Sequence, residues 1–262
     1  MPTMPSSTAL HRRRLLGHAA LLLPTPLLAL AGCASPWPEV PAGAGSSSAR
    51  QRLQEAAEAH GLPAWQTLQD ANLGFDRLAW PAAPGLQPVG PAQLRLMPAG
   101  GLAALQAAQG DPGARPLATA LHRLLVLGPL ALHGFTGAVN WAEPVTLQGR
   151  RCDHLHLQLA PGLGAAASDR LSLFIDREQG WLRRLQLSLQ ALDASALVQV
   201  DLTGHRRLHG VLWPLRFASV AGAPLAWQLT GLDVNRGYPA SALLATPWAG
   251  RAVAPAAALP PA

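Results

Sequence analysis

The sequence contains no lysine, so its 20 basic residues are all arginines. This absence excludes Schiff-base catalysis and a Walker-type phosphate loop, because both need an ammonium group. Charged residues make up only 13% of the chain, and the net charge of +6 is too small to indicate binding to nucleic acid. Nearly half of the residues are hydrophobic, which is enough to form the core of a single domain.

The N-terminus combines a cluster of arginines with a short apolar segment. Residues 12–14 are arginines, and an apolar run from Leu15 to Leu30, interrupted by prolines, follows them. Because a membrane span needs about 20 apolar residues, the run predicts an export signal rather than a span. The segment ends in Leu30, Ala31, Gly32 and Cys33.

These last four residues resemble the lipobox of bacterial lipoproteins. The resemblance implies a signal peptide over residues 1–32, cleavage between Gly32 and Cys33, and a diacylglycerol on the Cys33 thiol with a further acyl chain, such as palmitate, on the new amine. The alternative is an ordinary secretory signal with an incidental cysteine. Loss of the signal removes three arginines and no acidic residue, so the charge of the mature chain falls to +3.

The residues around Cys33 also carry information on sorting. Ala34 follows the cysteine where inner-membrane retention usually needs an aspartate, which implies an anchor in the outer membrane on its periplasmic side. The implied partners are the membrane, through the lipid anchor, and the machinery of lipoprotein export and processing. The pair Arg12 and Arg13 leaves the Sec and twin-arginine routes both open. With Cys33 acylated, Cys152 has no partner for an intramolecular disulfide.

Composition and periodicity divide the mature chain into three parts. Residues 33–48 are rich in Pro, Gly, Ala and Ser and are predicted to be a flexible tether. Residues 49–238 are predicted to form the folded domain, and residues 239–262 an Ala- and Pro-rich disordered tail. Within the domain, apolar residues at helical spacing predict helices over Ala49–His60, stopped by Gly61, and over Pro116–Leu127, stopped by Gly128.

The intervening and following segments have other patterns. A short third helix is predicted within Gly101–Gln109, and the segment with Pro81, Pro84, Pro88 and Pro91 is interpreted as a loop or a short edge strand. Beyond Pro129, alternating leucines and valines separated by turn residues predict an antiparallel meander with one dry and one polar face. The predicted strands are centred on Leu157, Leu173, Leu187, Val200, Trp213 to Phe217 and Trp227.

Two groups of residues resemble the superfamily of outer-membrane lipoprotein carriers and receptors (LolA/LolB-like). The first is a His-Gly step followed by a tryptophan: His60, Gly61, Leu62, Ala64, Trp65 and Leu68. The second consists of strand and turn residues: Gln148, Gly149, Arg150, Cys152, Phe174, Ile175, Asp176, Arg183, Arg184, Gly210, Val211, Trp213 and Pro214. The resemblance spans residues 50–238. It implies an α+β, mainly β fold, an open antiparallel half-barrel with helices on a concave face that binds acyl chains.

Three sets of polar residues are candidate reactive sites. Cys152, His154 and His156 share one strand face and have side chains that suit zinc, but solvent-facing histidines are common. Asp176 and Glu178 flank a predicted turn, where an aspartate serves backbone hydrogen bonds more often than acid-base catalysis. A triad of Ser195, Asp201 and His205 lacks the G-x-S-x-G elbow. We therefore predict no catalytic residue, metal or cofactor, and no enzyme activity.

The remaining candidates are large apolar side chains. Trp141, Trp181, Trp213, Phe217 and Trp227 are expected to fill the core beneath the helices, or to line a groove where the helices leave space. We predict a ligand-lining set of Leu117, Leu121, Leu124, Trp213, Phe217 and Trp227. The expected function is a non-enzymatic outer-membrane lipoprotein that binds a hydrophobic or lipid-like ligand in the periplasm. The alternative is an accessory envelope lipoprotein with a filled core that acts through protein contacts.

Overall fold

The computed structural model describes residues 37, 45–82, 85–164, 167–222 and 224–241. The described residues all belong to one unit of the chain, the part from Trp37 onward. The predicted signal peptide, Cys33, most of the predicted tether and residues 242–262 of the predicted tail lie outside them. None of the helices in this described part has the length and apolar content needed to span a bilayer.

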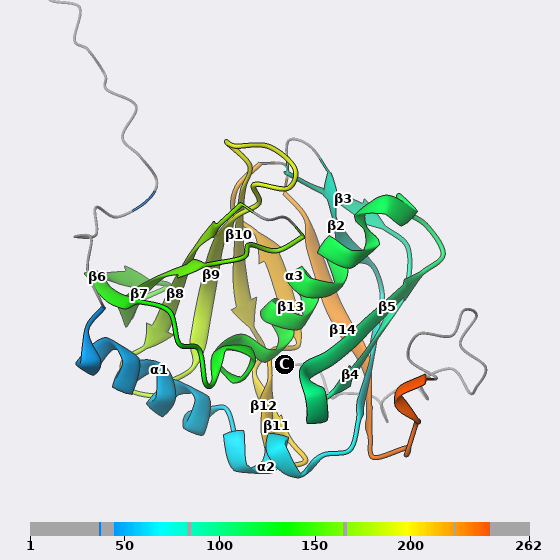
Figure 1. Ribbon diagram of the computed structural model, residues 1–262, viewed down its shortest axis with the longest axis horizontal. Coiled ribbons are helices and arrows are strands. Elements are labelled where there is room, and N and C mark those ends of the chain that lie inside the picture. The colour runs from blue at the N-terminus through cyan, green and yellow to red at the C-terminus, as the bar shows by residue number, and fades with distance from the viewer. Residues whose placement is uncertain (1–36, 38–44, 83–84, 165–166, 223, 242–262) are drawn as a thin grey trace, which may run out of the picture. The chain divides into compact units, whose positions relative to one another are not determined.

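Ten strands form one antiparallel sheet in the order β5-β4-β1-β14-β13-β10-β9-β8-β7-β6 (Figure 1). Their bounds are β1 (Ala71–Phe75), β4 (Ala92–Met97), β5 (Leu102–Ala107), β6 (Val139–Leu147), β7 (Arg150–Leu159), β8 (Asp169–Asp176), β9 (Leu182–Ser188), β10 (Leu197–Thr203), β13 (Arg216–Ser219) and β14 (Ala226–Val234). The sheet is curved and its two ends, β5 and β6, are not paired with each other, so it is an open half-barrel. This confirms the predicted fold class.

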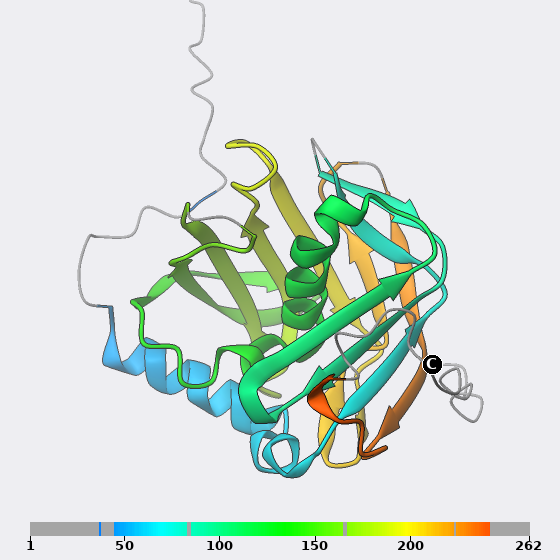
Figure 2. The same cartoon turned by 45° about the vertical axis from the view of Figure 1, so that its right-hand side comes forward.

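The helices are α1 (Ser47–Ala59), α2 (Leu62–Thr67) and α3 (Arg115–Leu127), with three short 3₁₀ turns, η1 (Ala99–Gly101), η2 (Pro112–Ala114) and η3 (Gly128–Leu132). Figures 1 and 2 show α3 lying within the curve of the sheet. The two predicted long helices are confirmed, and they end where expected because Gly61 and Gly128 adopt positive φ angles of 92° and 51°.

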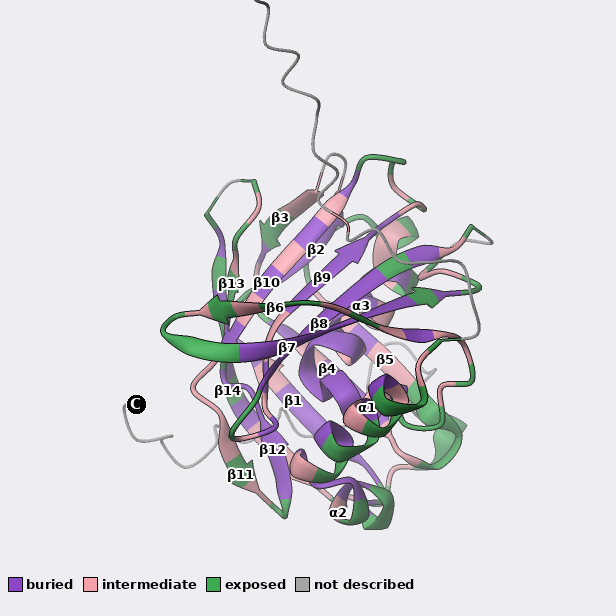
Figure 3. Ribbon diagram, turned by 90° about the vertical axis from the view of Figure 1, so that its left-hand side faces the viewer, coloured by how far each residue is buried: buried purple, intermediate pink, exposed green. Residues whose placement is uncertain are grey.

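The predicted meander is confirmed by its strand register. Leu155 pairs with Leu173, which pairs with Leu185, and that residue pairs with Val200. All four side chains are fully buried on the inner face of the sheet. Figure 3 shows long buried stretches in β7 and β8, whereas buried and half-buried residues alternate along β10. The opposite face carries the next row of paired residues, of which three are polar and one, Phe174, is aromatic: His154, Phe174, Arg184 and Asp201. Alternation along each strand therefore separates a dry inner face from a largely polar outer face.

One predicted strand is divided in the structure. Residues 211–217 form two short strands because Pro214 cannot donate a ladder hydrogen bond. The first, β12 (Val211–Trp213), pairs with β11 (Arg206–Leu208), and only the second, β13, stays in the main sheet. The proline-rich segment forms a separate hairpin of β2 (Leu78–Ala82) and β3 (Gly85–Val89), which agrees with the edge-strand interpretation.

The predicted third helix within Gly101–Gln109 is wrong. Leu102–Ala107 is strand β5, which pairs with β4 along its whole length. Its alanines, leucines and glutamine favour a helix in isolation, but the unpaired edge of β4 offers the backbone a ladder of hydrogen bonds, and tertiary pairing overrides a weak propensity. Gly101 and Gly110, both at positive φ, form turns at the two ends of the segment.

Candidate functional site

A cavity of about 790 Å³ lies beside α3, between β5, η3 and the end of β7. We call it the α3–β5 cavity. Its volume is in the range of pockets that bind small molecules, about 300–1,000 Å³. The residues that line it are Gly101, Ala103, Ala104, Leu105, Gln106, Pro112, Arg115, Pro116, Thr119, Ala120, Arg123, Leu124, Ala131, Leu132, Leu159, Pro161 and Leu163.

Small side chains line the cavity on both of its walls. Ala103 and Ala104 of β5 and Ala120 of α3 are lining residues, and none of them has a side chain long enough to fill the space between the strand and the helix. Four leucines form the apolar floor, and each is between 4% and 9% exposed: Leu105, Leu124, Leu132 and Leu159. Exposed prolines at positions 112, 116 and 161 mark the rim. The site is therefore an apolar hollow that is accessible from outside.

The cavity lies on the side of α3 opposite its fully buried leucines. Each residue of an α-helix is rotated by about 100° from the one before it. Leu121 and Leu125, which are fully buried, point toward the core, and the cavity-lining positions of α3 fall on the opposite half of the helix. Two rows with a spacing of four residues face the hollow: the polar row Arg115, Thr119 and Arg123, and the apolar row Pro116, Ala120 and Leu124.

The two arginines are the charged residues of the described lining, and no carboxylate accompanies them. Arg123 is half-buried and makes no ion pair or hydrogen bond with any described residue, and burial lowers the pKa of its guanidinium. Nε of Arg115 is buried and has no hydrogen-bond partner among the described residues. The Thr119 hydroxyl donates to the Arg115 carbonyl oxygen and so remains attached to the helix. The cavity thus combines an apolar floor with uncompensated positive charge.

The space beneath α3, in contrast, is filled by aromatic side chains. Phe217 stacks on Trp227 with ring centroids 5.4 Å apart, and Phe75 and His122 of α3 complete the cluster with edge contacts of about 6 Å. Trp213 packs edge-on against Trp65 of α2 at 6.2 Å. These side chains are nearly or fully buried. The concave face of the sheet is therefore packed where it meets the inner side of α3.

The structure separates the six predicted ligand-lining residues. Leu124 lines the α3–β5 cavity. The other five lie in the packed core and are not among the described residues of the cavity lining: Leu117, Leu121, Trp213, Phe217 and Trp227. Trp141 and Trp181 were also expected to fill the core or to line a groove. Trp141 is 41% exposed, and Trp181 packs on His205. That any of the six contacts a ligand stays a prediction.

Cys152, His154 and His156 share the outer face of β7, as alternation predicted. His154 stacks on Phe174 with ring centroids 4.3 Å apart, and His156 approaches the Ser172 hydroxyl at 3.3 Å. Burial lowers the pKa of His156 to about 4 and raises the pKa of Cys152. Among the described residues, no three His, Cys, Asp or Glu side chains are grouped closely enough to hold a metal ion.

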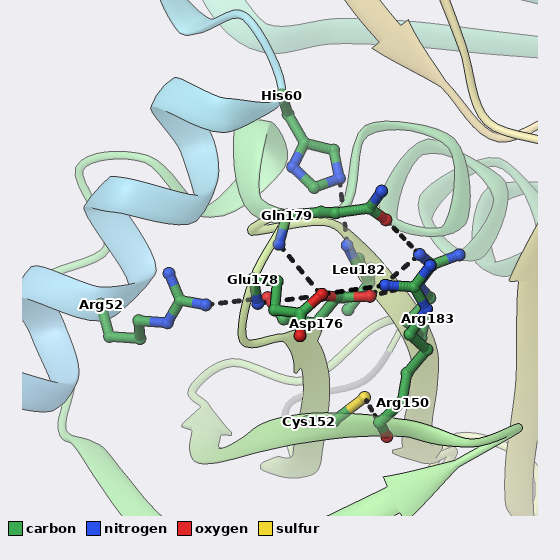
Figure 4. Close-up of polar contacts among 9 residues, drawn as sticks. All are labelled: Arg52, His60, Arg150, Cys152, Asp176, Glu178, Gln179, Leu182 and Arg183. Atoms are coloured by element: carbon green, nitrogen blue, oxygen red, sulfur yellow. Dashed lines mark hydrogen bonds and ion pairs between the residues drawn. The ribbon is translucent and has the colours of Figure 1, made fainter.

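Asp176 has a structural role in the turn between β8 and β9 (Figure 4). Its Oδ1 accepts hydrogen bonds from the amides of Glu178 and Gln179, and its Oδ2 accepts from Arg183 at 2.9 Å. Arg52 of α1 donates to the Asp176 carbonyl oxygen, and Nε2 of His60 accepts from the amide of Leu182 at 3.3 Å. The turn interpretation is confirmed, and the turn also attaches α1 to the sheet.

Ser195, Asp201 and His205 each have other neighbours. The Ser195 hydroxyl bonds to Asp193, whereas Asp201 forms an ion pair with Arg184. His205 lies beside Trp181, and burial lowers its pKa to about 3. These contacts do not arrange the three residues as a nucleophile, a base and an orienting acid.

The sequence reasoning missed the two cavity arginines. A signal was present, because positions 115, 119 and 123 repeat at four-residue spacing on the side of the helix opposite its leucines. That pattern alone is typical of a solvated helix face. Only the pairing of β5 with β4 places a wall across from these residues and encloses them.

Several solved structures resemble this one while sharing little of its sequence. A LolA superfamily protein from Nitrosomonas europaea is 14% identical, with 74% of this chain and 96% of that chain covered and a TM-score of 0.44. A domain from Vibrio parahaemolyticus, provisionally described as an outer membrane lipoprotein-sorting protein, is 10% identical, with coverage of 74% and 97% and a TM-score of 0.44. A DUF1329 family protein from Desulfovibrio piger is 9% identical, with coverage of 73% and 97% and a TM-score of 0.44. No protein-family model and no curated protein matches the chain.

Proposed function

We propose that this protein is a non-enzymatic envelope lipoprotein that holds a hydrophobic or lipid-like ligand in the α3–β5 cavity. The single observation that carries the proposal is the open hollow of about 790 Å³ with its floor of four leucines. Burying apolar ligand surface there contributes about 25 cal/mol per Å².

The proposal includes the location of the protein. The lipobox-like ending at Cys33 supports a lipid anchor, and Ala34 supports the periplasmic side of the outer membrane. Replacing Cys33 with Ser should abolish incorporation of labelled fatty acid and release the protein from outer-membrane fractions. Two or three acyl chains anchor a protein firmly, since each buried CH₂ contributes about 0.8 kcal/mol. Retained label in the Cys33→Ser variant would show that the anchor is assigned to the wrong residue.

The test for the ligand is native mass spectrometry of the full chain, extracted from its membrane and transferred to an amphipathic polymer. We expect a lipid adduct in addition to the mass of the anchor. Ala120→Trp places a bulky side chain in the hollow and should remove the adduct. Ala218→Trp is the matched control, because Ala218 is exposed on β13 and outside the cavity lining. An adduct that persists unchanged in Ala120→Trp would contradict the assigned site.

A second function is favoured by one observation, the aromatic cluster that fills the concave face beneath α3. A filled core suits an accessory lipoprotein that acts through protein contacts. If this second function is correct, we expect no lipid adduct in the wild type, in Ala120→Trp or in Ala218→Trp. We also expect crosslinking in intact cells to join the described domain to another envelope protein.

A further inference from the structure

The half-buried arginines of this domain differ in whether their charge is compensated. Arg52 meets Asp153 at 2.9 Å, and Arg183 meets Asp176 at 2.9 Å. Arg184 forms an ion pair with Asp201. Arg50 has no carboxylate but donates to the carbonyl oxygens of Phe135 and Gly137. In each case a partner offsets the cost of removing a guanidinium from water.

Arg123 differs from these four arginines. It is half-buried at the α3–β5 cavity, and within the described part of the chain it has no hydrogen bond, ion pair or carboxylate neighbour. Burial lowers the pKa of its guanidinium. Its Nη2 lies 3.4 Å from the place where a Cβ on Gly101 would stand, so the guanidinium reaches from α3 across to the start of β5. The missing side chain of Gly101 leaves it room.

Arg115 repeats the feature two turns earlier in the helix. Its buried Nε lacks a partner among the described residues, and it lines the same cavity. The two arginines are eight positions apart in the helix, which corresponds to about 12 Å along its axis. A guanidinium is a planar donor that matches carboxylate and phosphate oxygens. Two such groups therefore stand at separate points along one apolar trough.

We propose that the ligand is an anionic amphiphile, an acyl chain that carries a carboxylate or phosphate group. The chain lies on the leucine floor, and the anionic group accepts hydrogen bonds from the guanidinium of Arg123. Arg115 provides positive charge at the other end of the trough. This inference rests on the proposed function, because it specifies the chemistry of the same cavity. The charge complementarity of the lining is what selects an anionic ligand over a neutral one.

The test uses the full chain in an amphipathic polymer and two photoactivatable probes of equal chain length, a fatty acid and the corresponding fatty alcohol. After irradiation, labelled peptides are identified by mass spectrometry. We expect the acid to label segments 101–106 and 115–124 at concentrations about 10-fold lower than the alcohol, since hydrogen bonds between charged groups are stronger than those between neutral groups. A long-chain lysophosphatidate is expected to compete with the acid probe, whereas free phosphate is not.

Three variants isolate the role of the charge. Arg123→Gln should remove the preference for the acid over the alcohol, while Arg123→Lys should retain part of it because the positive charge remains without the planar fork. Arg216→Gln is the matched control, since Arg216 is exposed on β13 and lies outside the cavity lining. Thermal unfolding should show that Arg123→Gln is at least as stable as the wild type, because it loses a desolvated charge and no partner.

The possible outcomes distinguish the proposed function, binding of a hydrophobic ligand in the cavity, from the inference that this ligand is anionic. A preference for the acid that disappears in Arg123→Gln and persists in Arg216→Gln supports the inference. Equal labelling of the cavity by both probes, unchanged in Arg123→Gln, contradicts the proposal that the ligand is anionic. It remains consistent with a site for hydrophobic ligands. Labelling of neither cavity segment by either probe overturns the proposed function itself.

Discussion

The two sides of α3 differ in how the space beside them is used. On the inner side, Leu121 and Leu125 are fully buried above stacked aromatic rings. On the outer side, Pro116 and Ala120 of α3 and the alanines of β5 line a hollow, and the space remains open. Both sides belong to one helix of 13 residues. Side-chain size therefore decides which side becomes core and which side can hold a ligand, while the backbone fold is common to both.

The largest effect should come from removing an aromatic residue of the inner side. Trp227→Ala deletes the ring that stacks on Phe217 and should reduce the free energy of unfolding by about 3–5 kcal/mol. Urea unfolding of the chain from Trp37 onward, the compact unit of the structure, measures this change. A loss below about 1 kcal/mol would mean that the inner side is not packed as described.

A matched pair of leucines compares the two sides directly. Leu121→Ala should cost about 3 kcal/mol, because a fully buried side chain leaves a cavity behind. Leu124→Ala should cost about 1–2 kcal/mol, because Leu124 already borders open space and fewer contacts are lost. The same unfolding measurement serves both variants. Equal losses would argue that the α3–β5 cavity is closed in solution.

The buried imidazole of His122 makes the stability of the inner side depend on pH. Burial lowers the pKa of His122 to about 4, against 6.5 for an unperturbed histidine. Between these values the unfolded chain binds a proton that the folded chain does not, so stability is complete above pH 6.5 and falls as the pH decreases toward 4. The contribution is at most about 3 kcal/mol, at 1.36 kcal/mol per pKa unit.

The measurement is the difference between wild type and His122→Gln in urea unfolding at pH 7.0, 5.5 and 4.5. The difference is needed because His60 and His205 are also buried with lowered pKa values and act in the same direction. If the difference in the free energy of unfolding between the two proteins did not change with pH, His122 would be more exposed to water than the structure shows.

The smallest expected effect is on the outer side. Arg123→Met should leave the free energy of unfolding unchanged or raise it by up to about 1 kcal/mol, because an apolar side chain replaces an uncompensated charge. Arg184→Met, which removes the partner of Asp201, should instead destabilise the fold. A clear loss of stability in Arg123→Met would indicate a structural partner for this guanidinium.

The sequence predicted those parts of the fold whose residues repeat with a clear period. Apolar residues spaced three and four apart, ended by Gly61 and Gly128, were sufficient for α1 and α3. Alternating leucines, isoleucine and valines were sufficient for the strands from β7 to β10. The segment that became β5 failed, because its alanine-rich composition carries a helical propensity and its pairing with β4 is a long-range property.

The candidate site could be predicted only in part, for the same physical reason. Leu124 was recognised as apolar and helical, but whether a leucine lines a hollow depends on the size of the residues across from it. Ala103 and Ala104 lie opposite α3 only after β5 has joined the sheet. The exposure of Arg123 likewise depends on that strand. A pattern along one helix does not reveal which neighbour will enclose it.

The position of β5 at the end of the sheet has a kinetic consequence. Strand β4 pairs with it on one side, and on its other side no strand of the described residues pairs with it. The wall of the α3–β5 cavity can therefore separate by breaking one ladder of hydrogen bonds, without disturbing the aromatic core. Amide hydrogen exchange should be faster in β5 than in β8 or β9, which are paired on both sides. Entry and release of a ligand would then be governed by the opening of this single strand and not by the lifetime of the folded domain.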